Sequence, residues 1–461
     1  MKVLSIYEVN KAINGEIIRK ELIQKQYIKS ISIDTRKMER DSLYIPIIGE
    51  RFDGHDFIES AYEQGASLVL TSNKNKLSKD YGGIYVKDTK EALILLARYY
   101  RNLFKIPVIG ITGSVGKTSC KEMIASVLST GYQLHKTKGN YNNEIGLPLT
   151  ILSMNPSTEV AVYEMGMNHY REIDLLSSIA KPNFAIITNI GVSHIENFGS
   201  KDGILKAKSE IVNHLDKDGY LILNGDDLYL KRLESKVKQK IIYFGFENNN
   251  DYYITEYKEL GFKGIKATVK SPNNIYNIRI NALGKHLLYH VLSAIVIGEK
   301  LDLSKKQIEK GIYNYKSEKM RLNKITINNN ITIINDSYNA SVESMKAALD
   351  VLNNINTNGR KVAILGDMLE MGDYTSKAHS EVGTYAVDTD IDLLICVGEN
   401  AKWIYNQVCL LRGNQNLLYY PEQKELIKEI NYLIKSNDII LVKASRGMKL
   451  EDTIEKIKEV G

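Results

Sequence analysis

Cysteine, proline and tryptophan are scarce in this sequence: 461 residues include three, seven and one of them, respectively. The three cysteines (Cys120, Cys396 and Cys409) are too few for a disulfide framework, and no Cys-x-x-Cys pair is present to hold zinc. No run of about 18 apolar residues occurs, as a membrane-spanning helix would need. Residues 1–16 meet charged side chains too often to form a secretion signal. These absences predict a soluble protein of the reducing cytoplasm with no membrane partner.

A strong excess of one charge sign is also missing. Lysine and arginine total 61, and aspartate and glutamate total 55, so the formal net charge is +6. This mild excess permits an anionic ligand, but no stretch concentrates basic residues as a nucleic-acid surface does. With 43% hydrophobic and 25% charged residues, the composition is that of an ordinary globular protein. We therefore expect small-molecule substrates and no nucleic acid.

The chain is long enough for two to four domains at roughly 100–200 residues each. Residues 1–87 alternate short strand-like runs with polar turns, and a helix-like stretch (90–104) then leads into strand–loop–helix units. Between residues 244 and 280 the pattern changes to short pieces typical of antiparallel strands, followed by a helix-like stretch (286–301). A second α/β series begins after Lys316. The simplest partition is a small N-terminal α/β domain (1–87), a central parallel-sheet domain (88–314) and a C-terminal Rossmann-like domain (315–461).

Buried parallel strands are predicted where short apolar runs are bounded by Gly, Asn and Asp. In the central domain these runs are 107–112, 160–163, 184–188 and 220–223. In the C-terminal domain they are 331–334, 361–365, 393–397 and 439–442, each followed by a helix-like segment. Three consecutive asparagines (328–330) predict a hairpin turn.

The sharpest local signal is the segment GITGSVGKTS (110–119), which follows an apolar strand and precedes a helix. Small residues let backbone N–H groups surround a phosphate, and the helix N-terminus adds partial positive charge. Lys117 is then expected to reach the β- and γ-phosphates, and the Thr118 hydroxyl to bind Mg²⁺. The strict phosphate-loop pattern has glycine where this chain has Ile111, so Gly113 and Gly116 supply the flexibility. The alternative, a glycine-rich turn with an incidental lysine, is disfavoured by the flanking strand and helix.

Four further segments carry polar residues where predicted strands end, the place where α/β proteins build their sites. They are KTKGNYNNEIGLP (136–148), YEMGMNHYREI (163–173), the stretch from ITNIG to KSEI (187–211) and INDSYNASVESMKAAL (334–349). Together with LGDMLEMG (365–372) and LVKASRGMKLED (441–452), they closely resemble the Mur ligases of peptidoglycan synthesis. SIDTRK (32–37) and GERFDGHDF (49–57) resemble the uridine-nucleotide domain of that family, so the resemblance runs essentially end to end.

The resemblance implies an ATP- and Mg²⁺-dependent acid–amino-acid ligase. The segments EMGMNH, DSYNA and LGDM are similar to the sequence motifs of those members that join D-alanyl-D-alanine to UDP-N-acetylmuramoyl-tripeptide. In that reaction the tripeptide carboxylate attacks the γ-phosphate of ATP, and the dipeptide amine then attacks the resulting acyl phosphate. Both steps bring anions together, so the site must supply cations and fixed dipoles. We expect a monomer whose C-terminal domain receives the dipeptide.

The resemblance also assigns catalytic and metal-binding residues. Lys117, Glu164, His194 and Lys208 are the expected catalytic groups, and Thr118 joins the last three as a metal ligand. Because a plain ammonium would repel Mg²⁺, Lys208 is expected to carry a CO₂-derived carbamate. Without the resemblance, Glu164 could instead pair with a lysine, His194 could be a surface residue, and Lys208 could be a solvated helix lysine, as Lys206 is expected to be.

Binding residues follow in the same way. ATP contacts are expected from Gly113, Ser114, Val115, Gly116, Lys117, Thr118, Ser119, Arg321 and Asp336. Substrate contacts are expected from Asp34, Arg36, Asn140, Asn142, Asn143, His169, Tyr338, Asn339 and Arg446. His169 could instead only order its loop, and Arg446 could be a solvated surface residue. His379 is a further candidate to approach the ligands from the C-terminal domain.

This chain differs at a few positions from the residues that are usual in the family it resembles. Arg171 replaces a glycine in NHYREI, and Leu287 and His290 stand where asparagine is usual near the nucleotide. Contacts from these two positions to adenine or ribose therefore stay open. None of the departures falls in the phosphate loop or among the expected metal ligands.

Two other functions compete with this interpretation. A folylpolyglutamate synthase shares the phosphate loop and the amide chemistry, but the extra domain at residues 1–87 argues against it. A P-loop ATPase without ligase activity would normally place an aspartate pair after a long apolar strand, and it would hydrolyse ATP without an acceptor.

Overall fold

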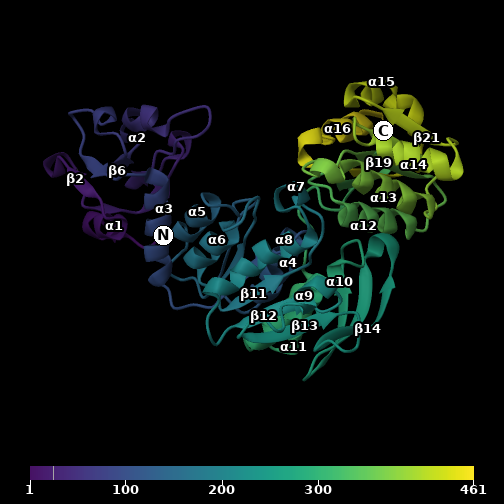
Figure 1. Ribbon diagram of the computed structural model, residues 1–461, viewed down its shortest axis with the longest axis horizontal. Helices are drawn as coiled ribbons and strands as arrows, with labels where there is room; N and C mark the ends of the chain where they lie inside the picture. The colour runs from purple at the N-terminus through teal and green to yellow at the C-terminus, as the bar shows by residue number, and fades with distance from the viewer. Residues whose placement is uncertain (24, 461) are drawn as a thin grey trace.

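The computed structural model describes residues 1–23 and 25–460 and has three lobes, each built on its own sheet (Figure 1). The N-terminal and C-terminal lobes stand at opposite ends of the central lobe (Figure 1). Within the described ranges, every helix is too short or too polar to cross a membrane. The three-domain α/β fold expected from the sequence is therefore confirmed, while the exact boundaries at residues 87/88 and 314/315 stay a prediction.

The N-terminal lobe is a five-stranded sheet in the order β2-β7-β6-β5-β4, in which only β2 runs antiparallel to its neighbour. Its strands are β2 (Glu16–Ile18), β4 (Ser30–Ser32), β5 (Ser42–Tyr44), β6 (Ala66–Thr71) and β7 (Gly83–Tyr85), with a separate pair β1 (Leu4–Ser5) and β3 (Tyr27–Ile28). Its helices are α1 (Ile6–Ile13) and α2 (Ile58–Glu63), and α3 (Thr89–Asn102) leads on into the central lobe.

Helix α3 fastens the first two lobes together through side chains near its C-terminal end. The Tyr100 hydroxyl donates to the Met154 carbonyl, and the buried Arg101 guanidinium donates to the Ala180 carbonyl. Both acceptors belong to the central lobe. Because these bonds are buried, breaking them would leave polar groups unsatisfied, which favours a fixed junction here.

The central lobe is a nine-stranded sheet in the order β16-β15-β14-β13-β12-β11-β8-β10-β9. The order reverses at β8, with β9 and β10 on one side and β11 and β12 on the other, and ligand crevices form at such switch points. The strands are β8 (Val108–Thr112), β9 (Leu134–Lys136), β10 (Val160–Glu164), β11 (Phe184–Ile187), β12 (Tyr220–Asn224), β13 (Lys240–Gly245), β14 (Tyr252–Glu259), β15 (Ile265–Lys270) and β16 (Ile275–Ile280).

Helices cover both faces of this sheet. The helices are α4 (Lys117–Leu128), α5 (Gly146–Leu152), α6 (Glu172–Ala180), α7 (Ile195–Phe198), α8 (Lys201–Ser209), α9 (Leu228–Lys231), α10 (Leu287–Lys300) and α11 (Lys305–Tyr313). Apolar side chains of α4, α10 and α11 share one buried cluster, and those of α5, α6 and α8 share another. Strand β8 is buried along its whole length between them, as the apolar run at 107–112 predicts.

The C-terminal lobe is a six-stranded sheet in the order β17-β18-β22-β19-β20-β21, with only β17 antiparallel. Its strands are β17 (Asn323–Thr326), β18 (Thr332–Asp336), β19 (Lys361–Gly366), β20 (Leu393–Val397), β21 (Leu417–Tyr420) and β22 (Ile439–Lys443). Helices α12 (Val342–Asn353), α13 (Thr375–Val387) and α14 (Lys402–Arg412) pack on one face, and α15 (Gln423–Leu433) and α16 (Glu451–Val460) on the other. The three asparagines turn the chain between β17 and β18, as predicted.

Candidate active site

A cleft of about 650 Å³ lies between the central and C-terminal lobes, at the carboxyl end of β8. Residues of both lobes line it, so it can hold a ligand that contacts two domains at once. The expected site residues found in its lining are Ser114, Val115, Gly116, Lys117, Thr118, Ser119, Asn140, Asn142, Asn143, Glu164, His194, Arg321, Asp336, Tyr338, Asn339 and Arg446. The expected residues outside the lining are Gly113, Lys208, His169, Asp34 and Arg36.

The phosphate loop requires glycine at two positions. Gly113 has φ +148°, and a Cβ there would lie 1.9 Å from Thr188 Oγ1. Gly116 has φ +83°, and a Cβ there would lie 2.5 Å from Cε1 of the buried His290 ring. Ile111, where the strict pattern has glycine, is instead a buried residue of β8. The loop therefore begins after the strand ends, and its two glycines meet the steric demand.

The segment that follows β11 holds the phosphate loop open. Asn189 accepts the Ser114 N–H through its carbonyl and the Val115 N–H through its side chain, at 3.1 and 2.9 Å. The Gly191 N–H donates to Ser114 Oγ at 2.9 Å. Lys117 Nζ folds back onto the Gly113 carbonyl at 2.8 Å, and burial lowers the pKa of its ammonium. These contacts shape a cradle that a phosphate can enter, with a cation already at its rim.

Glu164 ends β10 with only one of its carboxylate oxygens hydrogen-bonded. Asn142 Nδ2 donates to Oε1 at 2.8 Å, and the Glu164 N–H donates to Thr137 Oγ1. Oε2 is buried without a hydrogen bond and forms an ion pair with Lys121 Nζ at 3.7 Å. A buried carboxylate oxygen without a hydrogen bond that lines a phosphate cleft fits a Mg²⁺ ligand, because Mg²⁺ combines one or two carboxylates with substrate phosphates. The pairing with a lysine that the sequence left open is therefore present as an ion pair with Lys121, at a distance too long for a hydrogen bond.

The guanidinium of Arg321, from the C-terminal lobe, contacts Thr118 of the phosphate loop. Arg321 Nη2 donates to Thr118 Oγ1 at 3.0 Å, while its guanidinium lies over the Tyr338 ring with 4.3 Å to the centroid. Lys443 Nζ is buried and contacts Asp336 Oδ2 at 2.5 Å. The cleft therefore carries positive charge on both of its walls, as a site for two anionic reactants needs.

His194 precedes α7 and also faces the C-terminal lobe. Its Nδ1 lies 2.6 Å from Glu370 Oε2, and this contact holds the pKa of the Glu370 carboxyl below its usual value. Lys208 lies on α8 and is 1% exposed; burial, aided by the charge of Lys117, lowers the pKa of its amine well below the ordinary value. Lys206 is exposed and lies over the Tyr170 ring, so the two lysines do face different surroundings. Among the described residues no cluster of three or more His, Cys, Asp or Glu is present, so any metal here would also need hydroxyl or phosphate oxygens.

Comparison with known proteins covers all three lobes. Residues 27–101 match the family model for the Mur ligase family catalytic domain, residues 111–298 the Mur ligase middle domain, and residues 320–446 the Mur ligase glutamate ligase domain. The UDP-N-acetylmuramoyl-tripeptide–D-alanyl-D-alanine ligase of Bacillus subtilis (strain 168) is 40% identical over 450 residues, 96% of this chain and 97% of that protein. The chain belongs to the Mur ligase family.

Solved Mur ligases share the whole architecture. A crystal structure of MurF from Acinetobacter baumannii is 30% identical, covers 100% of this chain and 99% of that one, and gives a TM-score of 0.92. The MurF ligase of Thermotoga maritima, solved in complex with ADP, is 25% identical, covers 96% and 99% of the two chains, and gives 0.83. The resemblance and the fold class expected from the sequence are thus confirmed along the full chain.

Four expected substrate-binding residues of this Mur ligase lie outside the cleft or are already paired with another residue. His169 is exposed in the loop before α6. Asp34 and Arg36 pair with each other in the N-terminal lobe, where Arg36 Nε donates to Asp34 Oδ1 at 2.9 Å and the Arg36 side chain is 86% exposed. Arg446 lines the cleft, but its Nη1 contacts Glu451 Oε1 at 2.5 Å. Any substrate role for these four residues stays a prediction.

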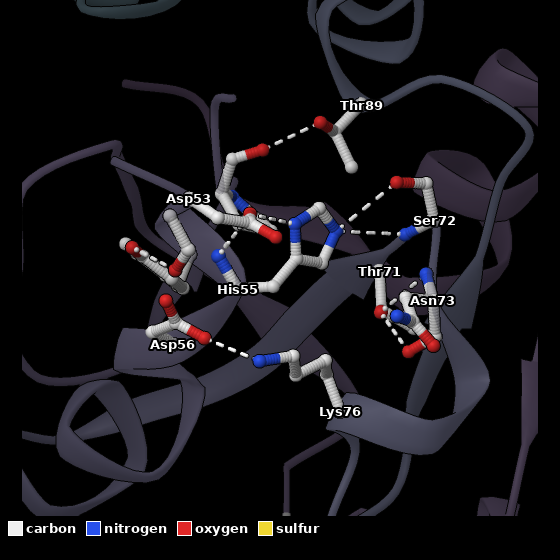
Figure 2. Close-up of polar contacts among 11 residues, drawn as sticks. Asp53, His55, Asp56, Thr71, Ser72, Asn73, Lys76 and Thr89 are labelled. Carbon is white, nitrogen blue, oxygen red and sulfur yellow. Dashed lines mark hydrogen bonds and ion pairs between the residues drawn. The ribbon is translucent and has the colours of Figure 1, made fainter. Parts of the chain in front are cut away.

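Figure 2 shows how the DGH sequence of the N-terminal lobe is used. His55 Nδ1 lies 2.6 Å from Asp53 Oδ1, and His55 Nε2 accepts the Ser72 N–H at 3.0 Å, with Ser72 Oγ at 3.1 Å. The residue types are those of a hydrolase triad, but the Nε2 lone pair needed to activate the hydroxyl is already taken by a backbone N–H. The arrangement instead ties the turn at Asp53–His55 to the end of β6.

His379 is likewise a structural residue rather than a ligand of the cleft. It is fully buried in α13, where Nε2 accepts the Met368 N–H at 2.9 Å and Nδ1 bonds the Thr375 carbonyl at 2.7 Å. With both ring nitrogens bonded inside the lobe, the expectation that it approaches the ligands is wrong. Its role is to hold the loop after β19, which carries Glu370.

Sequence reasoning missed two contributors to the cleft. Asn189 braces the phosphate loop, and its position directly after a predicted strand could have indicated this. Glu370 is in a segment that the sequence singled out, but its contact partner His194 lies in another lobe and 176 positions earlier in the chain. No local pattern encodes such a pair.

Proposed function

We propose that this protein is an ATP-dependent amide ligase that joins D-alanyl-D-alanine to UDP-N-acetylmuramoyl-tripeptide in peptidoglycan precursor synthesis. The observation that carries the proposal is the cleft, where a phosphate loop, a buried carboxylate oxygen without a hydrogen bond and polar loops of a second lobe converge. The full-length match to curated ligases with this activity supports the same substrates. A phosphate loop alone would support any nucleotide-dependent protein.

The first step transfers a phosphoryl group. A carboxylate oxygen of the tripeptide attacks the γ-phosphorus of ATP, the bond to the β-phosphate oxygen breaks, and ADP leaves. Lys117 would turn from the Gly113 carbonyl toward the β- and γ-phosphates, and the N–H groups of the loop would hold them in line. Glu164, Thr118 and His194 would hold Mg²⁺, which when bound neutralises charge on the phosphate oxygens.

The second step forms the amide. The dipeptide amine, after losing a proton, attacks the acyl carbon, and the bond to the phosphate oxygen breaks. Asp336, Tyr338 and Asn339 face the phosphate loop from the C-terminal lobe, where they can orient the incoming amine. Arg321 and Lys443 would offset the negative charge that builds up on the acyl phosphate.

We further propose that Lys208 carries a carbamate. CO₂ would add to its neutral amine and a proton would leave, which turns a cation into an anion able to bind the metal. Deep burial on α8 supports this assignment, since an isolated ammonium in such a place has no compensating partner. The resemblance to Mur ligases supplies the rest of the argument.

Replacement of Lys208 tests the carbamate. Lys208→Ala should lose most ligase activity, and a small added carboxylic acid should restore part of it by filling the vacated position. Lys206→Ala, in the same helix but exposed, should keep normal activity. Near-normal activity of Lys208→Ala at saturating Mg²⁺ would rule the carbamate out.

Working location and assembly follow from the same proposal. The reactants are water-soluble nucleotides and peptides, which supports a cytoplasmic enzyme without a nucleic-acid or membrane partner. The cleft is lined by residues of one chain, which supports a monomer. Product analysis tests the reaction itself: incubation with ATP, the UDP-linked tripeptide and D-alanyl-D-alanine should give the UDP-linked pentapeptide by mass spectrometry. A product formed only with glutamate and a folate would instead support a folylpolyglutamate synthase.

A further inference from the structure

One charged contact joins the central and C-terminal lobes at the rim of the cleft. His194 Nδ1 lies 2.6 Å from Glu370 Oε2, and both residues line the cleft. Nδ1 is buried and forms no other hydrogen bond, so the Glu370 carboxylate beside it is the partner that the structure offers. Glu370 is 55% exposed at its side chain and His194 21%, which leaves the pair open to a ligand in the cleft.

The backbone on both sides is shaped for this contact. His194 has φ +60° and Glu370 has φ +62°. These are left-handed backbone conformations that residues other than Gly, Asn and Asp rarely adopt. Helix α7, which follows His194, touches the turn η8 (Gly372–Tyr374) that follows Glu370. The approach is so close that a Cβ at Gly372 would lie 2.8 Å from Glu196 Cβ. The segment that follows His194 and the segment that follows Glu370 are therefore closely packed, and the His194 and Glu370 side chains meet between the lobes.

We propose that Glu370 is a positioning residue for His194. By accepting the Nδ1 proton, the carboxylate would leave the Nε2 lone pair free for a metal, and it fixes the ring orientation. Carboxylates support metal-binding histidines in this way in many proteins. This inference rests on the proposed function, in which His194 is a metal ligand.

The consequence is a link between domain closure and the metal site. Glu370 belongs to the C-terminal lobe, so it can contact His194 only when that lobe lies against the central one. Lobe opening would release the ring and weaken metal binding. The energetic coupling then works in both directions, because metal bound to an oriented His194 must also favour the closed arrangement.

Metal binding without turnover tests the proposal. The probe is Mn²⁺ in the presence of ADP, with bound and free Mn²⁺ distinguished by electron paramagnetic resonance. Glu370→Ala should weaken Mn²⁺ binding about tenfold, the lower end of the range for loss of a supporting carboxylate. Glu370→Gln, whose amide oxygen can still accept the Nδ1 proton, should recover most of that loss.

A matched control separates ring positioning from general loosening of the lobes. Asn354 Nδ2 donates to Glu259 Oε2 at 2.8 Å, a contact between the same two lobes on the exposed surface. Glu259→Ala should change Mn²⁺ affinity by less than twofold. In a His194→Ala background, Glu370→Ala should have no further effect, because its action passes through the ring.

Three results would overturn the proposal. Unchanged Mn²⁺ affinity in Glu370→Ala would do so, as would an equal loss in Glu259→Ala or a full additional loss in the His194→Ala background. If the unmodified protein with ADP binds no Mn²⁺ beyond that held by free ADP, the proposed function itself fails at its metal site. Thermal unfolding of each variant confirms that a lost affinity does not reflect lost folding.

Discussion

At the scale of single residues, the two glycines of the phosphate loop show how the site constrains the chain. Gly113 is confined by Thr188 and Gly116 by His290, so each is required by a different neighbouring element. Position 111 lies within β8 and has no such demand, which explains why isoleucine stands there. The requirement for glycine thus follows from what surrounds the loop rather than from the pattern alone.

Substitution of Gly113 should abolish nucleotide binding. The added methyl group would overlap Thr188 Oγ1, which is also bonded to the Val115 carbonyl, so the loop could not keep its shape. We expect Gly113→Ala to weaken ATP binding at least a hundredfold by calorimetry, equivalent to about 2.7 kcal/mol. Gly261→Ala is the matched control, since its φ is also positive but nothing lies within 4 Å of the new Cβ. Equal ATP affinity in the two variants would contradict this explanation.

His290 should make the protein sensitive to acid. Burial, with the charges of His286 and Arg321, lowers the pKa of His290 to about 3 from an ordinary value near 6.5. The neutral ring is favoured in the folded state, so its contribution is complete above pH 6.5 and is lost as the pH falls toward 3, at about 1.4 kcal/mol per pH unit.

Comparison with His290→Asn isolates this contribution. Between pH 6 and pH 4, the free energy of unfolding in urea should fall more steeply in the unmodified protein. The difference in slope should correspond to about one additional proton taken up on unfolding. Parallel curves for the two proteins would show that the ring titrates normally. His286, whose pKa burial lowers to about 4, remains in both and cancels in the comparison.

At the scale of elements, the interior strands could be predicted and the short edge strands could not. The predicted strand 393–397 coincides with β20, because a fully buried apolar run lies between Asp392 and Gly398. The strands β9 and β17 have three and four residues, none of them fully buried, and they leave no continuous apolar run. Strand β21 is apolar but only four residues long, and its two middle residues are half-buried. The pattern of apolar residues thus identifies a strand of a parallel sheet clearly only when both faces of that strand are buried.

Helix α6 begins at an unfavourable residue. Arg171, at its N-cap, has φ +71°, a left-handed conformation in which an arginine side chain is strained. Its N–H donates to Glu210 Oε1, a bond that glycine would keep. Arg171→Gly should therefore raise the free energy of unfolding by about 1 kcal/mol.

Chemical denaturation measures this change, with Lys217→Gly as a control. Lys217 is exposed and its φ is not positive, so glycine there should lower stability through the greater entropy of the unfolded chain. If both variants lose stability alike, residue 171 carries no backbone strain.

At the scale of the whole molecule, the site depends on how the lobes meet. The phosphate loop could be assigned from ten contiguous residues, whereas the contacts of Arg321 with Thr118 and of Glu370 with His194 join separate lobes. Spacing along the chain carries no information about such contacts. The resemblance to a family supplied Arg321, but only the structure pairs Glu370 with His194.

Substrate binding should draw the lobes together. ATP is expected on the central lobe and the dipeptide on loops of the C-terminal lobe, so catalysis needs these two lobes together, while the junction at α3 stays fixed. Small-angle scattering should show a smaller radius of gyration with a nucleotide and the UDP-linked tripeptide together than with either alone. Identical profiles in all states would mean that the lobes do not move.

The central claim is that phosphoryl transfer in this cleft is tied to amide formation, and phosphate release measures this directly. Release from ATP should be slow with the protein alone, and it should become fast only when both the UDP-linked tripeptide and D-alanyl-D-alanine are present, with one phosphate per peptide bond formed. Fast release by the protein alone, unchanged by either substrate, would contradict the account and identify an ATPase instead.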